Sequence, residues 1–145
     1  MSDYRKILVA VDLTQESSLI IDKARHIAKA NDAELTLIHA QMPLAVSYAL
    51  DIPSLNLADV EAELAEEGRK RLLELGEQAD VPAARLHHVI GQPAHEIRHL
   101  AKVIGADLIV TGGHGKHGLE LLLGSTSTSV AHGIACDLLI VKLPG

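Results

Sequence analysis

Short apolar runs that alternate with longer amphipathic segments limit most strongly how this chain folds. Residues 7–11, 108–111 and 138–141 form runs that are almost wholly apolar. Such runs are typical of strands covered on both faces, as in a parallel sheet. Residues 34–40 and the alternating segment 85–90 have the length and composition of two further strands. The sequence therefore predicts five strands.

The segments between these strands have the periodicity of helices. Residues 15–30, 57–78 and 93–104 place apolar side chains three and four positions apart. Thr14 is in position to cap the first of these helices, and residues 125–134 form a further candidate helix. Strands that alternate with helices predict a doubly wound, Rossmann-like α/β fold. We expect one domain, residues 1–145, with a five-stranded parallel sheet of order 3-2-1-4-5 and helices on both faces.

Charge and aromatic content argue against nucleic acid as a partner. The net charge is −6, whereas proteins that bind the phosphate backbone carry a surplus of Lys and Arg on one face. The chain has no Phe or Trp, so it lacks an aromatic platform on which bases stack. We expect no nucleic acid partner.

The remaining composition favours the cytoplasm. Cys136 is the only cysteine, which excludes an intramolecular disulfide and fits a reducing compartment. Residues 1–6 are charged and lead directly into the first apolar run, and no apolar stretch of about 18 residues follows. We therefore expect no signal peptide, no membrane partner and a cytoplasmic location.

Three segments are expected to meet at the carboxyl edge of the sheet, where ligands of such folds bind. They are Asp12, the pair His39 and Ala40, and residues 111–116. In the third segment Gly112, Gly113 and Gly115 are expected to bend the backbone and bring N–H groups close to an anion. Gly124 and Ser125 then begin a helix, whose free N–H groups favour phosphate. Together the glycines and the helix start predict a phosphate-binding site.

Two common nucleotide motifs are absent. The P-loop of nucleotide hydrolases has Ser or Thr after its Lys, whereas Lys116 is followed by His117. The dinucleotide fingerprint has glycines after the first strand, whereas residues 12–15 contain none. The pattern therefore favours neither class of enzyme.

Over nearly its whole length the chain resembles the universal stress protein family. The resemblance is carried by the strand ends at residues 9–12 and 37–39 and by a glycine motif near the C-terminus. Nucleotide-binding members of that family carry G-x2-G-x9-G-[ST], which Gly112, Gly115, Gly124 and Ser125 match here except in one spacing. Eight residues, 116–123, separate the second and third glycines. The shorter spacing resembles the A-type branch, some of whose members do not bind ATP.

The resemblance implies a binding site for ATP or AMP, with or without Mg²⁺. It implies that Asp12 bonds the ribose or the adenine edge, that Ala40 offers backbone groups to adenine, and that the glycines and Ser125 hold the phosphates. Further phosphate contacts are expected from His114, Lys116 and Thr126. Asp12 also has a structural interpretation, as the acceptor that caps the following turn. The family further implies a homodimer that pairs through the last strand and signals to a regulatory protein.

Two other functions remain open from the sequence. The first is a nucleotide-free dimer that acts through protein contacts, which the shorter glycine spacing favours. The second is a slow ATPase or phosphotransfer protein, in which Asp12 holds Mg²⁺ and His114 or Lys116 stabilises charge on the transferred group. We expect no dedicated catalytic residue and at most weak hydrolysis of ATP.

Residues 95–99 read H-E-x-x-H, the zinc-binding pattern of a protease helix. The apolar residues of the same helix predict that His95 and His99 face solvent, and no third ligand is placed nearby. We therefore expect no metal site. His87 and His88 are adjacent in a strand and are expected to face opposite sides of the sheet.

Overall fold

The computed structural model describes residues 3–44, 57–114, 134 and 136–143. The elements of this part of the chain are five strands, three longer helices and one 3-10 helix. The strands are β1 (Lys6–Ala10), β2 (Glu34–Gln41), β3 (Leu86–Ile90), β4 (Leu108–His114) and β5 (Asp137–Leu143). The helices are α1 (Ser17–Asn31), α3 (Leu57–Ala79) and α4 (Pro93–Ile104), with the 3-10 helix at Ala83–Arg85.

All five strands form one parallel sheet in the order β3-β2-β1-β4-β5. The predicted fold class and strand order are confirmed. The predicted helix at residues 125–134 lies outside the described residues, apart from Ile134, and so does most of the long segment between β2 and α3. No helix in the described ranges is long and apolar enough to cross a membrane.

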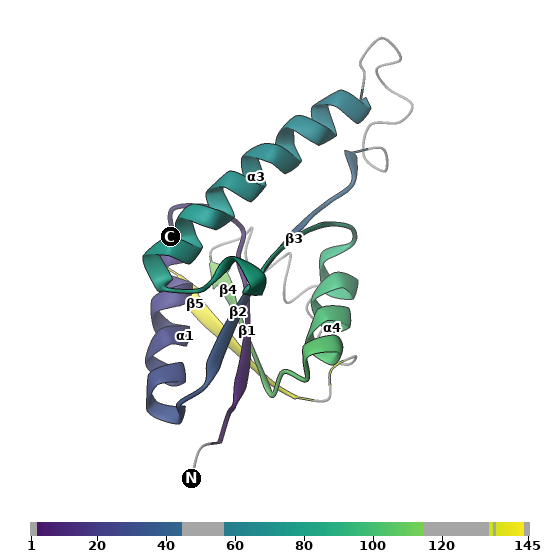
Figure 1. Ribbon diagram of the computed structural model, residues 1–145. Helices are drawn as coiled ribbons and strands as arrows, with labels where there is room; N and C mark the ends of the chain where they lie inside the picture. Colours follow the sequence, from purple (N-terminus) through teal and green to yellow (C-terminus); the bar gives the residue numbers. More distant parts are fainter. Residues whose placement is uncertain (1–2, 45–56, 115–133, 135, 144–145) are drawn as a thin grey trace.

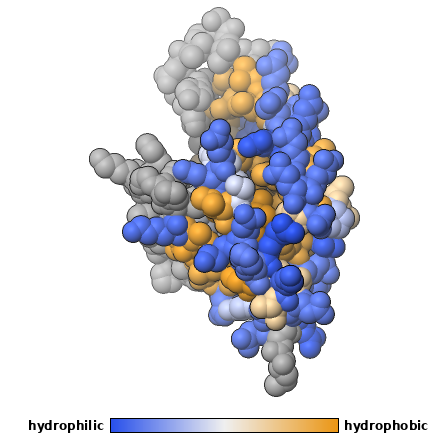
Figure 2. Space-filling model, turned by 90° about the vertical axis from the view of Figure 1, so that its left-hand side faces the viewer, coloured by the Kyte–Doolittle hydropathy of each residue, from blue (hydrophilic) through white to orange (hydrophobic). Residues whose placement is uncertain are grey.

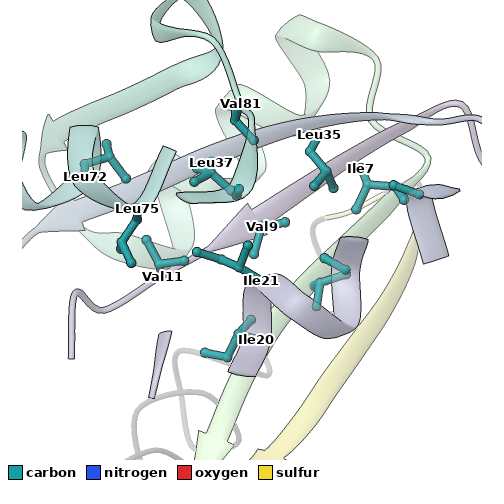
Figure 3. Close-up of a cluster of buried hydrophobic side chains, with 14 of the residues drawn as sticks. Ile7, Val9, Val11, Ile20, Ile21, Leu35, Leu37, Leu72, Leu75 and Val81 are labelled. Carbon is teal, nitrogen blue, oxygen red and sulfur yellow. The ribbon is translucent and has the colours of Figure 1, made fainter. Parts of the chain in front are cut away.

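Helices cover both faces of the sheet. In Figure 1, α1 and α3 lie on one side of the strands and α4 lies on the other. The larger apolar core fills the space under α1 and α3, where the labelled side chains of Figure 3 point toward one another. Seen from the side of α1, the surface is mostly hydrophilic, with apolar groups between the polar ones (Figure 2). The sheet is therefore a buried middle layer, as its apolar strands predict.

The second core lies under α4 and is smaller. Its buried members are Leu8, Ile38, Ile97, Ala101 and Ile109. Alternate residues of β1 point to opposite faces, so Ile7 and Val9 belong to the first core and Leu8 to the second. All three are 0% exposed, so the middle of β1 is fully buried between the two layers of helices.

Two glycines let α3 approach β3 closely. A Cβ on Gly68 would lie 2.8 Å from Cδ2 of His88, and a Cβ on Gly76 would lie 2.6 Å from Cδ1 of Leu86. Real Cβ atoms do not make contacts this short, so both positions require glycine at this spacing. The imidazole of His88 and the side chain of Leu86 fill the room that the missing Cβ atoms leave.

Two carboxylates bind the N-terminal segment to the half of the sheet formed by β4 and β5. Asp107, just before β4, accepts hydrogen bonds from the N–H groups of Arg5 at 2.9 Å and of Lys6 at 3.1 Å. Asp137, the first residue of β5, accepts a bond from the Tyr4 hydroxyl at 2.8 Å. These bonds fix the edge of the sheet that lies opposite the candidate site.

Candidate functional site

The strand order reverses between β1 and β4. From β1 the chain proceeds outward to β2 and β3, whereas β4 and β5 lie on its other side. Ala10 pairs with Thr111, so the segments that follow β1 and β4 leave the sheet from neighbouring positions. In open α/β sheets this is the place where ligands bind. Asp12 follows the end of β1 here, and Gly112 is the residue of β4 after Thr111.

Asp12 organises the turn between β1 and α1. Its Oδ1 accepts hydrogen bonds from the Thr14 N–H at 3.1 Å, the Thr14 hydroxyl at 2.8 Å and the Ser17 hydroxyl at 3.0 Å. Between them Leu13 has a φ of 65°, a left-handed conformation that a side chain rarely adopts. Since Ser17 is fully buried, the third bond also satisfies a hydroxyl that water cannot reach.

The sequence prediction that Thr14 caps α1 is wrong, because the cap position is Glu16. Thr14 is instead a donor to Asp12, two positions earlier. The structural interpretation of Asp12, as the acceptor that holds the next turn, is confirmed.

Only one carboxylate oxygen of Asp12 is used in this way. The side chain is exposed, and within the described part of the chain no hydrogen bond reaches Oδ2. A fixed Oδ1 holds the carboxylate in one orientation, so Oδ2 is an oriented acceptor at the edge of the sheet. The structural role and a ligand-binding role of Asp12 are therefore compatible.

The backbone of Ala40 faces the same place. The ladder between β1 and β2 ends where the Val11 N–H donates to the Ile38 carbonyl at 2.9 Å. On the other side of β2, the Gln41 carbonyl accepts a bond from the Gly91 N–H, also at 2.9 Å. Because successive residues of a strand direct their N–H and C=O groups to alternate sides, those of Ala40 point toward β1.

β1 does not extend far enough to pair with Ala40, because it ends at Ala10 and the chain turns at Asp12 toward α1. Among the described residues, the next rung of the ladder, from the Ala40 N–H to the Val11 carbonyl, is not formed. Ala40 is only partly buried. One donor and one acceptor of the main chain are thus presented side by side at the switch point.

The glycine segment differs from its prediction. The sequence predicts a strand that ends at Thr111 and a bend at Gly112, whereas β4 continues to His114 and pairs with β5 through Gly112–Val141, Gly113–Lys142 and His114–Leu143. The expectation that Gly112 and Gly113 form a tight turn is wrong, since Gly105 is the glycine with positive φ among the described residues. Gly112, which is only partly buried, places no side chain at this end of β4. Gly115, Lys116, Gly124, Ser125 and Thr126 lie outside the described residues.

Sequence reasoning missed a pair of imidazoles beside Ala40. His39 and His88 are partners in the β2–β3 register, and their ring centroids lie 5.0 Å apart. Burial first, and then the positive charge of His88, lower the pKa of His39 to about 4, although Asp12 opposes the shift. The strand register, together with a glycine in the covering helix, would have been the signal for this pair.

The H-E-x-x-H segment lies on α4, which covers the opposite face of the sheet from α1 and α3 (Figure 1). His95 and His99 are exposed, as predicted, and their rings stack with centroids 6.4 Å apart. In the described ranges no three His, Cys, Asp or Glu side chains gather closely enough to hold a metal ion.

Comparison with known proteins gives one consistent family. The model described as "Universal stress protein family" matches residues 3–142. Universal stress protein A homolog 2 of Coxiella burnetii is 40% identical over 146 residues, which cover 100% of this chain and 99% of that protein. Universal stress protein YxiE of Bacillus subtilis is 34% identical over 147 residues, which cover 96% and 99%.

Solved structures share the same architecture. The hypothetical protein MJ0577 is 26% identical with a TM-score of 0.76, over 97% of this chain and 96% of that one. A universal stress protein solved in complex with cAMP is 24% identical with a TM-score of 0.62, over 97% and 98%. Both agree with the fold described above.

Proposed function

The chain belongs to the universal stress protein family, and on that premise we propose that it binds an adenine nucleotide, ATP or AMP, beside β1. Occupancy of the site, rather than turnover, then carries a signal to a regulatory protein. The observation that carries the proposal is the backbone of Ala40, unpaired within the described ranges, at the same edge of the sheet as the oriented Oδ2 of Asp12.

These groups complement the nucleotide. The Ala40 carbonyl and N–H form an acceptor and donor pair in one plane, and adenine offers a donor amino group beside ring-nitrogen acceptors. Oδ2 of Asp12 accepts from a ribose hydroxyl, and a charged acceptor makes the stronger bond. Leu13 and Met42, both partly exposed, supply aliphatic contacts in a chain without Phe or Trp. A universal stress protein of the same fold was solved in complex with cAMP, which supports an adenine nucleotide as the ligand.

The phosphates extend toward the end of β4 in this proposal. Gly112 lies there without a side chain, and Gly115, Gly124, Ser125, His114, Lys116 and Thr126 are the residues that we assign to the phosphate tail, with or without Mg²⁺. This assignment rests on the family resemblance and on the sequence, not on described geometry.

We further propose a cytoplasmic homodimer that pairs through β5. This strand is an edge of the sheet, and its apolar residues from Leu138 to Val141 remain partly exposed. Exposed apolar edges favour pairing with another strand, and an identical chain provides one. A mass that does not exceed that of the monomer in solution would contradict this part.

Calorimetric titration with ATP and with AMP, each with and without Mg²⁺, tests the nucleotide proposal. The informative variant is Asp12→Asn, because its amide oxygen still accepts the bonds of Thr14 and Ser17 while its nitrogen replaces the free acceptor with a donor. We expect binding to weaken about tenfold or more, with a folded protein of somewhat lower thermal stability because the three bonds at Oδ1 lose their charge assistance. The control is Asp22→Asn, an equal charge change on the exposed side of α1.

The outcomes separate the alternatives. Equal weakening by both variants would indicate a general charge effect and contradict a role for Asp12. No binding by the folded wild type would favour the nucleotide-free dimer, which the eight-residue glycine spacing already supports. Mg²⁺-dependent phosphate release that Asp12→Asn abolishes would favour the slow ATPase.

A further inference from the structure

A pair of histidines lies between the sheet and α3. His39 of β2 and His88 of β3 are register partners, so their side chains share one face of the sheet. Their rings are tilted by 42° with centroids 5.0 Å apart. The His88 ring lies directly against Gly68 of α3. The pair is therefore part of the surface on which α3 packs.

The polar atoms of this pair have no partners in the described part of the chain. Nδ1 of His39 and both ring nitrogens of His88 are buried without a hydrogen bond. A neutral imidazole in this setting leaves weak dipoles unpaired, whereas a protonated one leaves a charge and two donors unpaired. Protonation is thus much more costly here than in water.

The surrounding charges do not offset this cost for the pair as a whole. From α3, Arg69 faces His88 and disfavours a second positive charge, although Arg69 is itself paired with Glu66 at 3.0 Å. From the end of β1, Asp12 faces His39 and favours its protonation, but less than burial opposes it. The positive charge of a protonated His88 also disfavours protonation of His39, and burial is the leading cause that lowers the pKa of both imidazoles.

We propose that the His39–His88 pair makes the packing of α3 sensitive to acid, so that protonation of the pair releases α3 from β2 and β3. At neutral pH both rings are uncharged and the helix lies on them. As pH falls below the ordinary pKa of histidine, the open form binds protons more readily than the packed form, and the equilibrium shifts toward opening. The released face of α3 carries Leu72 and Leu75, so acid would expose apolar surface.

Amide hydrogen exchange measures this opening by element. Protection factors are compared at about pH 7.5 and about pH 5, after correction for the intrinsic pH dependence of exchange. We expect protection in the buried half of α3 to fall about tenfold or more relative to that of α4, which packs on the other face. The double variant His39→Leu/His88→Leu should lose this pH dependence, because its side chains do not titrate.

The matched control is His95→Leu/His99→Leu, which removes two exposed histidines from α4. It should retain the wild-type response of α3. A response that persists in His39→Leu/His88→Leu, or that disappears in the control, would overturn the proposal.

A second measurement does not depend on any variant. Titration of the imidazole Cε1–H resonances of the wild type should show His39 and His88 still neutral at about pH 6.5, the ordinary pKa of histidine. If both are half protonated at that pH, the proposal is wrong. Neither experiment involves a nucleotide, so the result is independent of the proposed function.

Discussion

The imidazole of His88 occupies the space where residue 68 would carry a Cβ, with Cδ2 of the ring 2.8 Å from that position. A glycine within a helix of 23 residues lowers helix propensity by about 1 kcal/mol relative to alanine. Gly68 therefore lowers the stability of the helix itself but allows α3 to pack close to the sheet.

Replacement of Gly68 by alanine should destabilise the protein. Overpacking against the rigid ring costs about 1–3 kcal/mol, and the gain in helix propensity offsets about 1 kcal/mol of that. We expect a net loss of about 1 kcal/mol in the free energy of unfolding, measured by urea denaturation. In a His88→Ala background, where the ring is absent, the same Gly68→Ala change should be neutral or stabilising. A stabilising effect in the wild-type background would show that α3 can move away at no cost.

Loss of the Ser17 hydroxyl should weaken the turn that follows β1. Ser17 is fully buried and donates to Oδ1 of Asp12 at 3.0 Å, so Ser17→Ala removes a charge-assisted bond. We expect a loss of about 1–2 kcal/mol in urea denaturation. Ser18→Ala is the control, since the exposed Ser18 hydroxyl bonds only the Gln15 carbonyl, at 3.2 Å. Equal effects of the two changes would contradict the importance of the Asp12 bond.

Stability should fall as the solution is acidified below the ordinary pKa of histidine. The pKa of His39 is about 4 in the folded protein and about 6.5 when unfolded, so between these values the unfolded chain binds more protons. The stability that a neutral His39 provides is present above about pH 6.5 and is lost as pH falls toward 4. With allowance for partial exposure we expect about 1–2 kcal/mol from this residue.

The variant His39→Leu checks this expectation by urea denaturation at several pH values. Its curve should be flatter than that of the wild type between about pH 6.5 and about pH 4. His26→Leu is the control, since it removes an exposed histidine from α1 and leaves His39 and His88 in place. Parallel curves for His39→Leu and the wild type would mean that His39 titrates normally in the folded state.

Cys136 should react slowly with alkylating reagents. Burial first, and then the negative charges of Asp137 and Asp107, raise the pKa of its thiol, so less thiolate is present near neutral pH. We expect iodoacetamide to label the folded protein more slowly than the protein in concentrated urea. As Cys136 is the only cysteine, total incorporation reports on it directly. Equal labelling rates in the folded and unfolded protein would show that the thiol is not shielded and that its pKa is not raised.

Much of the fold could be predicted from the sequence because each strand is a short apolar run that only a covered sheet satisfies. The runs around Val9, Ile109 and Leu139 mark β1, β4 and β5. Element ends were less predictable, since they depend on partners. β4 continues to His114 because β5 is long enough to pair with it, and this partner is remote in sequence.

The candidate site was predictable in part for a similar reason. Asp12 and Ala40 follow from their places at strand ends. The pairing of His39 with His88 depends on the β2–β3 register, and the function of Gly68 depends on how closely α3 lies against that register. A one-residue shift of the β2–β3 register would separate these side chains. The residues of one strand alone do not show which residues of the other strand they pair with.

The position of β1 in the sheet also affects how the protein is made. β1 is an interior strand, and one of its two neighbours is β4. Lys6 and the Asp107 carboxylate that binds its N–H are 101 residues apart along the chain. During synthesis one edge of β1 therefore remains unpaired until β4 has been made and most of the polypeptide has left the ribosome. We expect the nascent chain to need shielding of Ile7–Ala10 over this interval and to complete its sheet in a single late step.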